Sequence, residues 1–323
     1  MKIALDAMGG DYAPAEVIKG GLVAAQEDGV YIAFVGPEER LRAELPSDNP
    51  VASQVNFVNA TEVVTMQDSP VTAFKQKRDS TIVVGMELVK SGQADAFVSA
   101  GNTGAIVTTA LLVLGRKKGI ARPALSAMFP FPSGPLLFLD LGANCECKPS
   151  FLVQFARMGS IYMRKVFDIE WPRVGLLSNG EEENKGNKLV QDTHKQLKKG
   201  RLNFIGNVEG KDIARGVADV IVTDGFTGNV LLKMGEGLGE MMLEVLKRGL
   251  SAQSDLQAAA GLLQPVVRSI ISIMDYTEYG GALLLGVDGN VVVAHGRSDA
   301  KAIRNAILAA GRAVEHEVVQ ALG

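Results

Sequence analysis

Short apolar runs alternate with longer amphipathic stretches along the whole chain. Several of these runs are apolar at consecutive positions, which is typical of strands covered by helices on both faces. The alternation predicts βαβ units and an α/β fold with a mainly parallel sheet sandwiched by helices. We expect strands at residues 2–6, 31–35, 55–58, 96–99, 136–141, 174–178, 203–206, 220–224 and 290–294, and helices at residues 14–26, 104–114, 150–166, 185–199, 229–247 and 298–321.

Residues 250–276 interrupt this alternation. They are apolar at intervals of about three to four residues, and Pro265 breaks or kinks the pattern, which predicts a helical excursion. Packing in the core or against a second copy is the favoured interpretation. Contact with a membrane surface is the alternative, and it would depend on apolar insertion because few basic residues flank the segment. Without a linker or repeat, residues 1–323 are expected to form a single α/β catalytic unit, in one body or two lobes.

Composition narrows the class of protein. The 323 residues are 47% hydrophobic with 36 glycines, which favours a globular α/β enzyme. A net charge of −3 and the lack of a basic tract argue against a nucleic-acid partner. An early charge at Lys2 and the short apolar runs predict a soluble, cytoplasmic protein. Cys145 and Cys147 are too few for a disulfide framework, and the three histidines show no metal-ligand spacing.

The most informative stretch is Val-Thr-Asp-Gly-Phe-Thr-Gly-Asn-Val-Leu-Leu-Lys at residues 222–233. It predicts the end of a buried strand, an acid, a small-residue loop and the start of a helix. Such a loop leaves backbone N–H groups unpaired at a helix N-terminus, where an anion can bind. Thr227 and Asn229 add neutral donors, whereas Lys233 lies a full turn into the helix, where we expect it to be solvated.

Other loops of this kind follow other predicted strands, at residues 6–11, 99–104, 140–144, 178–187, 206–211 and 295–299. Ligands of open parallel sheets bind outside the carboxyl ends of the strands, so we expect all seven loops to share one rim. Each also has a plainer interpretation. Asp6 and Asp11 tighten a turn, Lys185 and Lys211 are solvated, and Ser298 and Asp299 cap the last helix.

His295 follows the buried run at residues 291–294. A histidine in this place is either a satisfied core residue or a group that transfers a proton, and the sequence leaves both roles open.

In this order, the loops resemble those of the phosphate acyltransferase family of bacterial phospholipid synthesis, over essentially the whole chain. Members of that family convert acyl-[acyl-carrier-protein] and orthophosphate to acyl phosphate. The resemblance implies a fold related to the isocitrate dehydrogenase and phosphotransacetylase group, a homodimer without metal or organic cofactor, and an association with the inner face of the membrane. Asp224-x-x-x-Gly228-Asn229 looks like the Asp-Leu-Asn-Ala-Gly-Asn loop of phosphotransacetylases, and Arg297-Ser298-Asp299 is similar to their later catalytic turn.

The chain departs from the family pattern at three places. Cys145-Glu146 stands where the family often has Val-Asp, and Val293 stands where many members have lysine. Arg297 replaces a small residue. Positions 293, 295 and 297 face one side if the strand persists that far, so we expect Arg297 to supply the cation that Val293 cannot.

The implied chemistry is attack of phosphate on a thioester carbon. The predicted catalytic residues are His295, Asp224, Arg297 and Asn229. The predicted phosphate- and substrate-binding residues are Gly101, Asn102, Thr103, Gly104, Asn144, Asn179, Lys185, Gly225, Thr227, Gly228 and Ser298. The segment at 250–276 is expected to line a slot for the acyl chain. The acidic acyl carrier protein is expected to dock on lysines 185, 188, 195, 198 and 199, unless these form an ordinary solvated face.

Two alternatives stay open. One is a phosphotransacetylase-like enzyme that uses acyl-coenzyme A, and the other is a non-catalytic acyl-binding protein that organises partners at the membrane. A dehydrogenase is disfavoured because no Gly-x-Gly-x-x-Gly fingerprint with a following acid is found.

Overall fold

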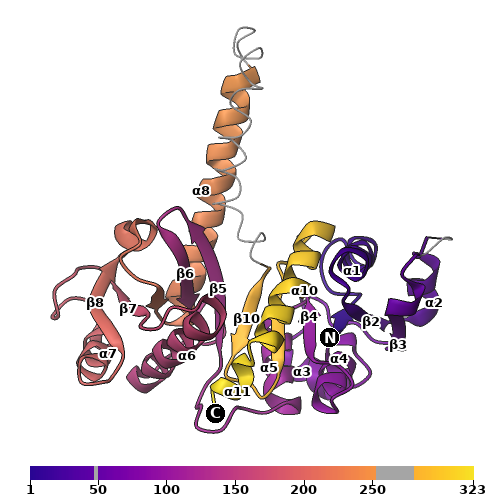
Figure 1. Ribbon diagram of the computed structural model, residues 1–323, viewed down its shortest axis with the longest axis horizontal. Coiled ribbons are helices and arrows are strands. Elements are labelled where there is room, and N and C mark those ends of the chain that lie inside the picture. The colour runs from indigo at the N-terminus through magenta and orange to yellow at the C-terminus, as the bar shows by residue number, and fades with distance from the viewer. Residues whose placement is uncertain (47–49, 252–279) are drawn as a thin grey trace.

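The computed structural model describes residues 1–46, 50–251 and 280–323, and its strands form a single sheet (Figure 1). The strand order across the sheet is β3-β2-β1-β4-β11-β10-β5-β6-β9-β7-β8. The strands are β1 (Lys2–Asp6), β2 (Tyr31–Gly36), β3 (Val55–Asn59), β4 (Ala96–Ser99), β5 (Ala124–Phe131), β6 (Gly134–Leu139), β7 (Arg173–Ser178), β8 (Asn203–Glu209), β9 (Val220–Val222), β10 (Ala282–Leu285) and β11 (Asn290–Val293).

The sheet reverses direction near its middle. Strands β1, β2, β3, β4 and β11 are parallel to one another, and β6, β7, β8 and β9 are parallel to one another. Between these groups, β10 is antiparallel to β11 and β5, and β5 is antiparallel to β6. The two groups therefore run in opposite directions. The single strand direction behind the predicted shared rim is therefore wrong, because β5 and β10, which turn the sheet around, were not among the expected strands. The prediction holds in part, since the loops at residues 99–104, 140–144, 222–233 and 295–299 all contribute residues to one cleft.

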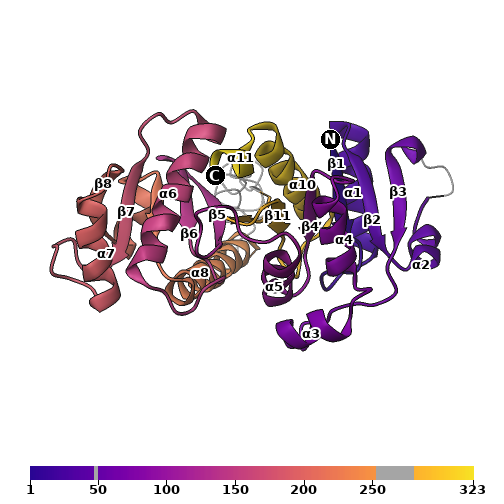
Figure 2. The same cartoon turned by 90° about the horizontal axis from the view of Figure 1, so that it is seen from below.

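Helices cover both faces (Figure 2). The core beneath α1 (Ala15–Asp28), α6 (Pro149–Phe167), α7 (Lys188–Lys198), α10 (Ala300–Glu315) and α11 (Val318–Ala321) is one continuous cluster along the sheet. α2 (Glu38–Ala43) lies beside β2 and β3. The opposite face carries α3 (Pro70–Gln76), α4 (Thr81–Lys90), α5 (Thr103–Val113) and α8 (Gly225–Ser251), and the short helices are η1 (Ala52–Gln54) and η2 (Gly210–Arg215).

The core on this second face is divided. One cluster packs α4 and α5 against β1, β4 and β11, around Phe97 and Ile106. Another packs η2 and the first turns of α8 against β6, β7 and β9, around Phe138 and Ile221. The division falls over β10 and β5, where the strand direction changes, and it leaves a cleft between α5 and α8.

Helix α8 begins against the sheet, and its C-terminal part projects away from the body (Figure 1). Large apolar side chains are exposed along it at intervals of three to four residues, namely Phe226, Val230, Met234, Leu238, Met241, Met242 and Val245. We call this row the α8 apolar stripe. The expected excursion at residues 250–276 lies almost wholly outside the described residues.

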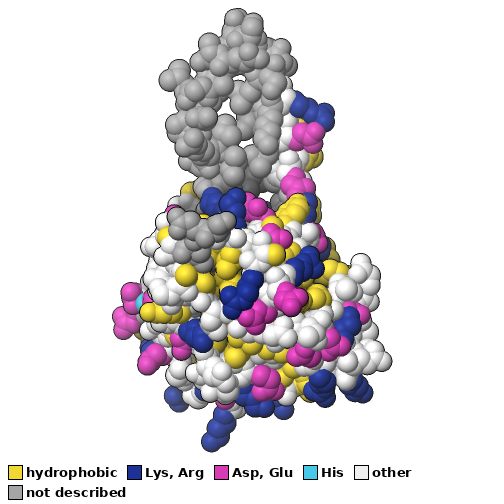
Figure 3. Space-filling model, turned by 90° about the vertical axis from the view of Figure 1, so that its right-hand side faces the viewer, with side chains coloured by type: hydrophobic (Ala, Val, Ile, Leu, Met, Phe, Trp, Pro, Cys, Tyr) yellow, Lys and Arg dark blue, Asp and Glu magenta, His cyan; other side chains and the backbone are white. Residues whose placement is uncertain are grey.

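The surface beside the β3 edge mixes charges of both signs (Figure 3). Among the helices of the described residues, none is long and apolar enough to cross a membrane.

Candidate active site

A cleft of about 340 Å³ with both polar and apolar walls lies on the second face of the sheet, between the N-terminus of α5 and the side of α8. Its floor is formed by residues of β5, β10 and β11. Of the predicted site residues, Gly101, Thr103, Gly104, Asn229 and His295 line it. The other lining residues are Met66, Leu125, Ala127, Leu141, Gly142, Leu232, Lys233, Glu236, Ala282, Val293, Ala294 and Gly296.

Asn102 sets the N-terminus of α5. Its Oδ1 accepts a hydrogen bond from the N–H of Ala105 at 3.1 Å, and its Nδ2 donates to the carbonyl of Thr65 at 3.1 Å. The next two backbone N–H groups, of Thr103 and Gly104, have no acceptor within the described residues. They carry the positive end of the helix dipole, so this wall of the cleft favours an anion.

A buried pair beneath α5 holds the turn before it. The Ser99 hydroxyl donates to Asp6 Oδ2 at 2.6 Å and accepts from the N–H of Gly101 at 3.0 Å. Burial raises the pKa of Asp6, while the Ser99 hydroxyl and the N–H of Met8 oppose that rise. Asp6 thus tightens the turn at the end of β1 and links it to the loop after β4, as its plainer interpretation predicted.

The N-terminus of α8 differs from the predicted anion cradle. Asp224 Oδ1 accepts from the N–H of Thr227 at 2.9 Å, and its Oδ2 accepts from the Thr227 hydroxyl at 2.8 Å. The N–H of Gly225 donates to the carbonyl of Asn144 at 2.8 Å. The predicted loop is therefore the first turn of a helix capped by its own acid, and the donors of Gly225 and Thr227 are already used.

Asp140 organises the neighbouring loop. This fully buried carboxylate accepts from the backbone N–H groups of Leu125, Gly142, Ala143 and Asn144, at 2.8–3.2 Å, and from the Asn144 side chain at 2.8 Å. Burial raises the pKa of Asp140, but an acceptor surrounded by N–H donors fits the ionised form. The Asn144 amide also donates to the carbonyl of Pro123, so it is committed to the loop rather than offered to an oxyanion.

The same loop places Gly228 and Cys147. A Cβ at Gly228 would lie 1.9 Å from the carbonyl oxygen of Asp140, so only glycine allows α8 to approach this closely. The pKa of the Cys147 thiol is raised to about 12, mainly by burial and to a smaller extent by the charge of Asp140. A thiol with that pKa is not a nucleophile at neutral pH.

The side of α8 contributes three polar groups to the cleft, from Asn229, Lys233 and Glu236. Within the described residues, Lys233 has no carboxylate within ion-pair distance, and Glu236 Oε1 is buried without a hydrogen-bond donor. Lys233 is exposed, as the sequence predicted, and it also lines the cleft, whereas Glu236 was not among the predicted site residues. The spacing from Asn229 by four and then three residues puts all three on one helix face, which could have identified them.

His295 lies directly after β11 and is half-buried in the cleft. Its Nδ1 accepts from the N–H of Arg297 at 3.1 Å, so the neutral ring carries its hydrogen on Nε2. Burial is the main cause that lowers the pKa of His295; Arg297 and Lys233 lower it further, whereas Glu236 and Asp11 raise it. This geometry favours a neutral His295 that donates a hydrogen bond from Nε2 over a His295 that accepts a proton there.

The remaining predicted residues lie outside the cleft lining. Because β11 ends at Val293, the alternation expected to bring Arg297 beside His295 does not continue, and the Arg297 guanidinium pairs with Glu240 at 3.0 Å. Asn179 accepts from the N–H of Gly186 after β7, a strand separated from β5 by β6 and β9, and Lys185 lies in the same loop.

Of the two residues in the turn before α10 that were expected to cap this helix, Asp299 does so and Ser298 does not. Asp299 caps α10 by accepting from the N–H of Ala302 at 2.9 Å, as predicted. The buried hydroxyl of Ser298 has no partner among the described residues, and its binding role stays a prediction.

An apolar groove of about 680 Å³ adjoins the cleft. Leu141, Leu232 and Glu236 line both spaces. Its walls are otherwise almost entirely apolar, with Phe129, Phe131, Pro132, Phe138, Gly210, Ile213, Ala214, Gly228, Leu231, Gly235 and Leu238.

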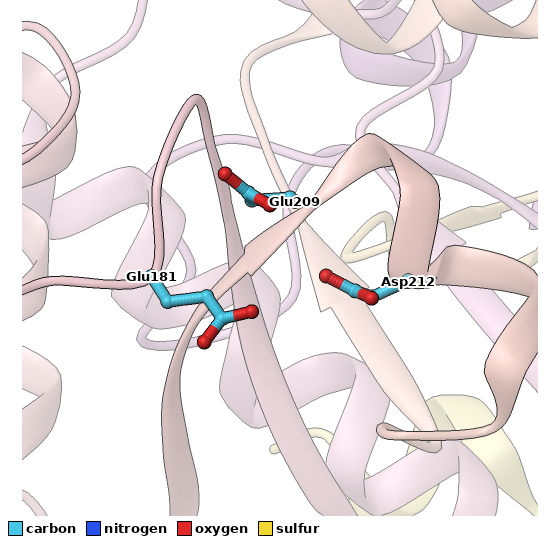
Figure 4. Close-up of side chains that lie close together, drawn as sticks. All are labelled: Glu181, Glu209 and Asp212. Carbon is cyan, nitrogen blue, oxygen red and sulfur yellow. The ribbon is translucent and has the colours of Figure 1, made fainter.

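Three acids after β7 and β8 also lie close together, with one oxygen each of Glu181, Glu209 and Asp212 within 4.8 Å of the others (Figure 4). Glu209 pairs with Lys211, and Asp212 pairs with Arg215 at 2.7 Å, so basic neighbours partly balance their charge. None of the three lines the cleft.

Comparison with known proteins identifies relatives over nearly the full chain. The model of the family described as "Fatty acid synthesis protein" matches residues 1–321. The phosphate acyltransferase of Pelotomaculum thermopropionicum is 48% identical over 320 residues, which cover 99% of this chain and 93% of that protein. The phosphate acyltransferase of Heliobacterium modesticaldum is 49% identical over 323 residues, which cover 100% of this chain and 96% of that protein.

Solved structures confirm the predicted α/β fold of the phosphotransacetylase type. The crystal structure of a phosphotransacetylase from Streptococcus pyogenes has a TM-score of 0.63 at 20% identity and covers 98% of this chain and 94% of its own. A 4-hydroxythreonine-4-phosphate dehydrogenase from Klebsiella pneumoniae has a TM-score of 0.56 at 13% identity, covering 97% and 99%. At these identities the likeness concerns the fold alone.

Proposed function

Because the chain belongs to the fatty acid synthesis protein family, we propose that it is a phosphate acyltransferase that converts acyl-[acyl-carrier-protein] and orthophosphate to acyl phosphate and free carrier protein. Its relatives that carry the name phosphate acyltransferase match it over nearly their whole length. The acyl donor and the roles of individual residues are part of the proposal.

The observation that carries the proposal is the set of unpaired donors in the cleft. The N–H groups of Thr103 and Gly104 face the same space as the Lys233 ammonium, and within the described residues none has an acceptor. Two backbone donors at a helix N-terminus and one mobile cation suit a phosphate ion. Phosphate therefore binds against α5, on the opposite wall from the predicted cradle at α8.

The apolar groove supports a long acyl group as the second substrate. Its volume lies within the range of roughly 300–1,000 Å³ that is usual for small-molecule sites, and its walls are apolar. Because it shares Leu141 and Leu232 with the cleft, an acyl chain in the groove would bring its thioester to the phosphate. This assigns the acyl slot to described residues of β5, β6 and α8.

In the reaction, a phosphate oxygen attacks the thioester carbon, the carbon–sulfur bond breaks, and the thiolate leaves and takes a proton. The developing oxyanion needs a donor, and the Nε2–H of neutral His295 and the amide of Asn229 are the two candidates in the cleft. Removing such a donor typically slows acyl transfer by about 100- to 1,000-fold. Much of the remaining acceleration comes from holding both substrates in place.

The decisive experiment incubates the protein with long-chain acyl-[acyl-carrier-protein] and phosphate and traps acyl phosphate with hydroxylamine. Formation of acyl hydroxamate that requires phosphate supports the proposal. A parallel assay with acyl-coenzyme A distinguishes the phosphotransacetylase-like alternative. Tight acyl binding without phosphate-dependent loss of either thioester would instead favour a non-catalytic acyl-binding protein.

Acyl carrier protein is the proposed partner. Of the α7 lysines predicted to dock it, Lys195 pairs with Asp192 and Lys198 pairs with Glu183, while Lys188 and Lys199 have no ion pair within the described residues. Two unpaired lysines on an exposed helix suit an acidic partner. Charge reversal at both positions should raise the KM for acyl-carrier protein and leave that for phosphate unchanged.

A homodimer is also proposed, with the α8 apolar stripe as its contact surface. Seven large apolar side chains on one projecting helix are more than isolated surface residues would explain. Association with the cytoplasmic face of the membrane through residues 250–276 remains a proposal from the sequence. Analytical ultracentrifugation and sedimentation with lipid vesicles test the two separately.

A further inference from the structure

Glu236 stands where the cleft meets the groove. It lines both spaces, together with Leu141 and Leu232. Its Oε1 is buried, and no described residue donates a hydrogen bond to it. A buried carboxylate oxygen without a donor is costly unless a ligand supplies the hydrogen. The oxygen therefore points to a ligand that brings a proton of its own.

A contrast on the same helix supports this interpretation. Glu240, one turn further along α8, pairs with Arg297, and Glu244 pairs with Arg248. Glu236 forms no such pair within the described residues, although Lys233 lies three positions before it. Glu236 lines both cavities, and its buried Oε1 has no donor among the described residues.

The other polar groups of the cleft call for an anion. Within the part of the chain that the structure describes, the N–H groups of Thr103 and Gly104 and the Lys233 ammonium are donors without acceptors. A fully ionised anion placed there would meet the Glu236 carboxylate as a like charge. An anion that keeps an O–H group can instead donate that hydrogen to Oε1 while its other oxygens accept from the donors.

We propose that Glu236 restricts the anion site to oxyanions that carry a proton, and so selects phosphate over sulfate. At neutral pH, phosphate always keeps at least one P–O–H group, whereas sulfate has the same shape and none. A site built around one hydrogen bond rejects an analogue that lacks the partner, because its own polar group is then left unpaired. The inference rests on the proposed function in one respect, that the cleft is the phosphate site.

The test measures binding of inorganic phosphate and of sulfate to the full chain by isothermal titration calorimetry, at constant ionic strength in chloride. The wild-type protein should bind phosphate at least about tenfold more tightly than sulfate, as expected for one hydrogen bond to a charged group. Glu236→Gln should bring the two affinities to within about threefold, since the amide removes the like charge and can donate to sulfate. Glu244→Gln, on the same helix but outside both cavities, should keep the wild-type ratio.

Equal affinities in the wild-type protein would overturn the inference without any substitution. So would a Glu236→Gln protein that keeps the full preference for phosphate, or one that is folded by circular dichroism but binds neither anion. Because no thioester is present, the result is independent of catalysis. Selective phosphate binding without acyl phosphate formation would contradict the proposed function alone, and acyl phosphate formation without selectivity would contradict this inference alone.

Discussion

Helices α5 and α8 each follow a buried strand and carry a Thr-Gly pair in their first turn, yet their N-termini differ in what they leave unpaired. The cap of α5 is the neutral Asn102, and the next two N–H groups are left for a ligand. The cap of α8 is the acidic Asp224, which supplies the helix with its own anion. Under the proposed function, the charge of the capping residue therefore makes the N-terminus of α5 the phosphate site rather than that of α8.

The contribution of α8 comes instead from its side. Asn229, Lys233 and Glu236 lie one to three turns beyond the cap and face the cleft. One helix thus presents its end and the other its flank to the same space.

Making the cap of α5 like that of α8 should have the largest effect. Asn102→Asp keeps a good helix cap but puts a negative charge beside the free N–H groups. Repulsion at this range corresponds to a few kcal/mol at an intermediate dielectric constant, so the KM for phosphate should rise at least about 100-fold in steady-state assays. Asn102→Ser, which caps without charge and also loses the bond to Thr65, is the control. Equal losses in both variants would show that shape, and not charge, matters at this cap.

Removing the cation of α8 should have the next largest effect. Lys233→Met retains the length of the side chain but cannot bind an anion. The KM for phosphate should rise roughly 10- to 100-fold, as for one charge-assisted hydrogen bond. Lys90→Met, at the exposed end of α4, should behave like the wild-type protein. A KM for phosphate at the wild-type value in Lys233→Met would show that this lysine is only solvated and does not bind phosphate.

Neutralising the cap of α8 should matter much less. Asp224→Asn leaves an equally good cap and removes only a favourable charge at the helix N-terminus. We expect the free energy of unfolding, measured in urea, to fall by no more than about 1 kcal/mol, with the KM for phosphate within about threefold of wild type. A drop in kcat of more than about tenfold, with the free energy of unfolding unchanged, would instead show that Asp224 is catalytic, as the sequence predicted.

The smallest effect should be seen at His295, which senses charges on both sides of the cleft. The pKa of His295 in the ligand-free protein should lie below the ordinary value of about 6.5, so the folded protein binds this proton less readily than the unfolded chain. The stability that His295 contributes is therefore present above the ordinary pKa and is lost as the pH falls from that value to the lower pKa of the folded protein. Lys233→Met should raise this pKa by removing a nearby cation. An NMR titration measures the imidazole pKa in the wild-type protein and in Lys233→Met. The His295 signal is identified by its absence from the spectrum of His295→Gln. Titration above the ordinary value would contradict this expectation, because His295 would then carry more positive charge near neutral pH.

Much of the fold could be predicted from the sequence because its strands are local and strongly apolar. β1 and β4 were predicted at their observed bounds, and several others within one or two residues. β5 and β10 were missed, and β5 includes Pro130, which is unfavourable inside a strand. These two strands reverse the sheet, so their omission led to the wrong expectation of a single strand direction.

The α/β class, the family resemblance and five residues that line the cleft could be read from the sequence, because the alternation of apolar runs and the polar, glycine-containing loops after strands are local patterns. The sequence also placed the acid at residue 224 and the neutral cap at residue 102, which are local facts. The tertiary structure was needed to show which helix N-terminus borders the cleft and which residues of α8 line it. Those outcomes depend on the direction of the central strands and on the side of α8 that packs against the sheet, and neither is encoded in any short stretch of the chain.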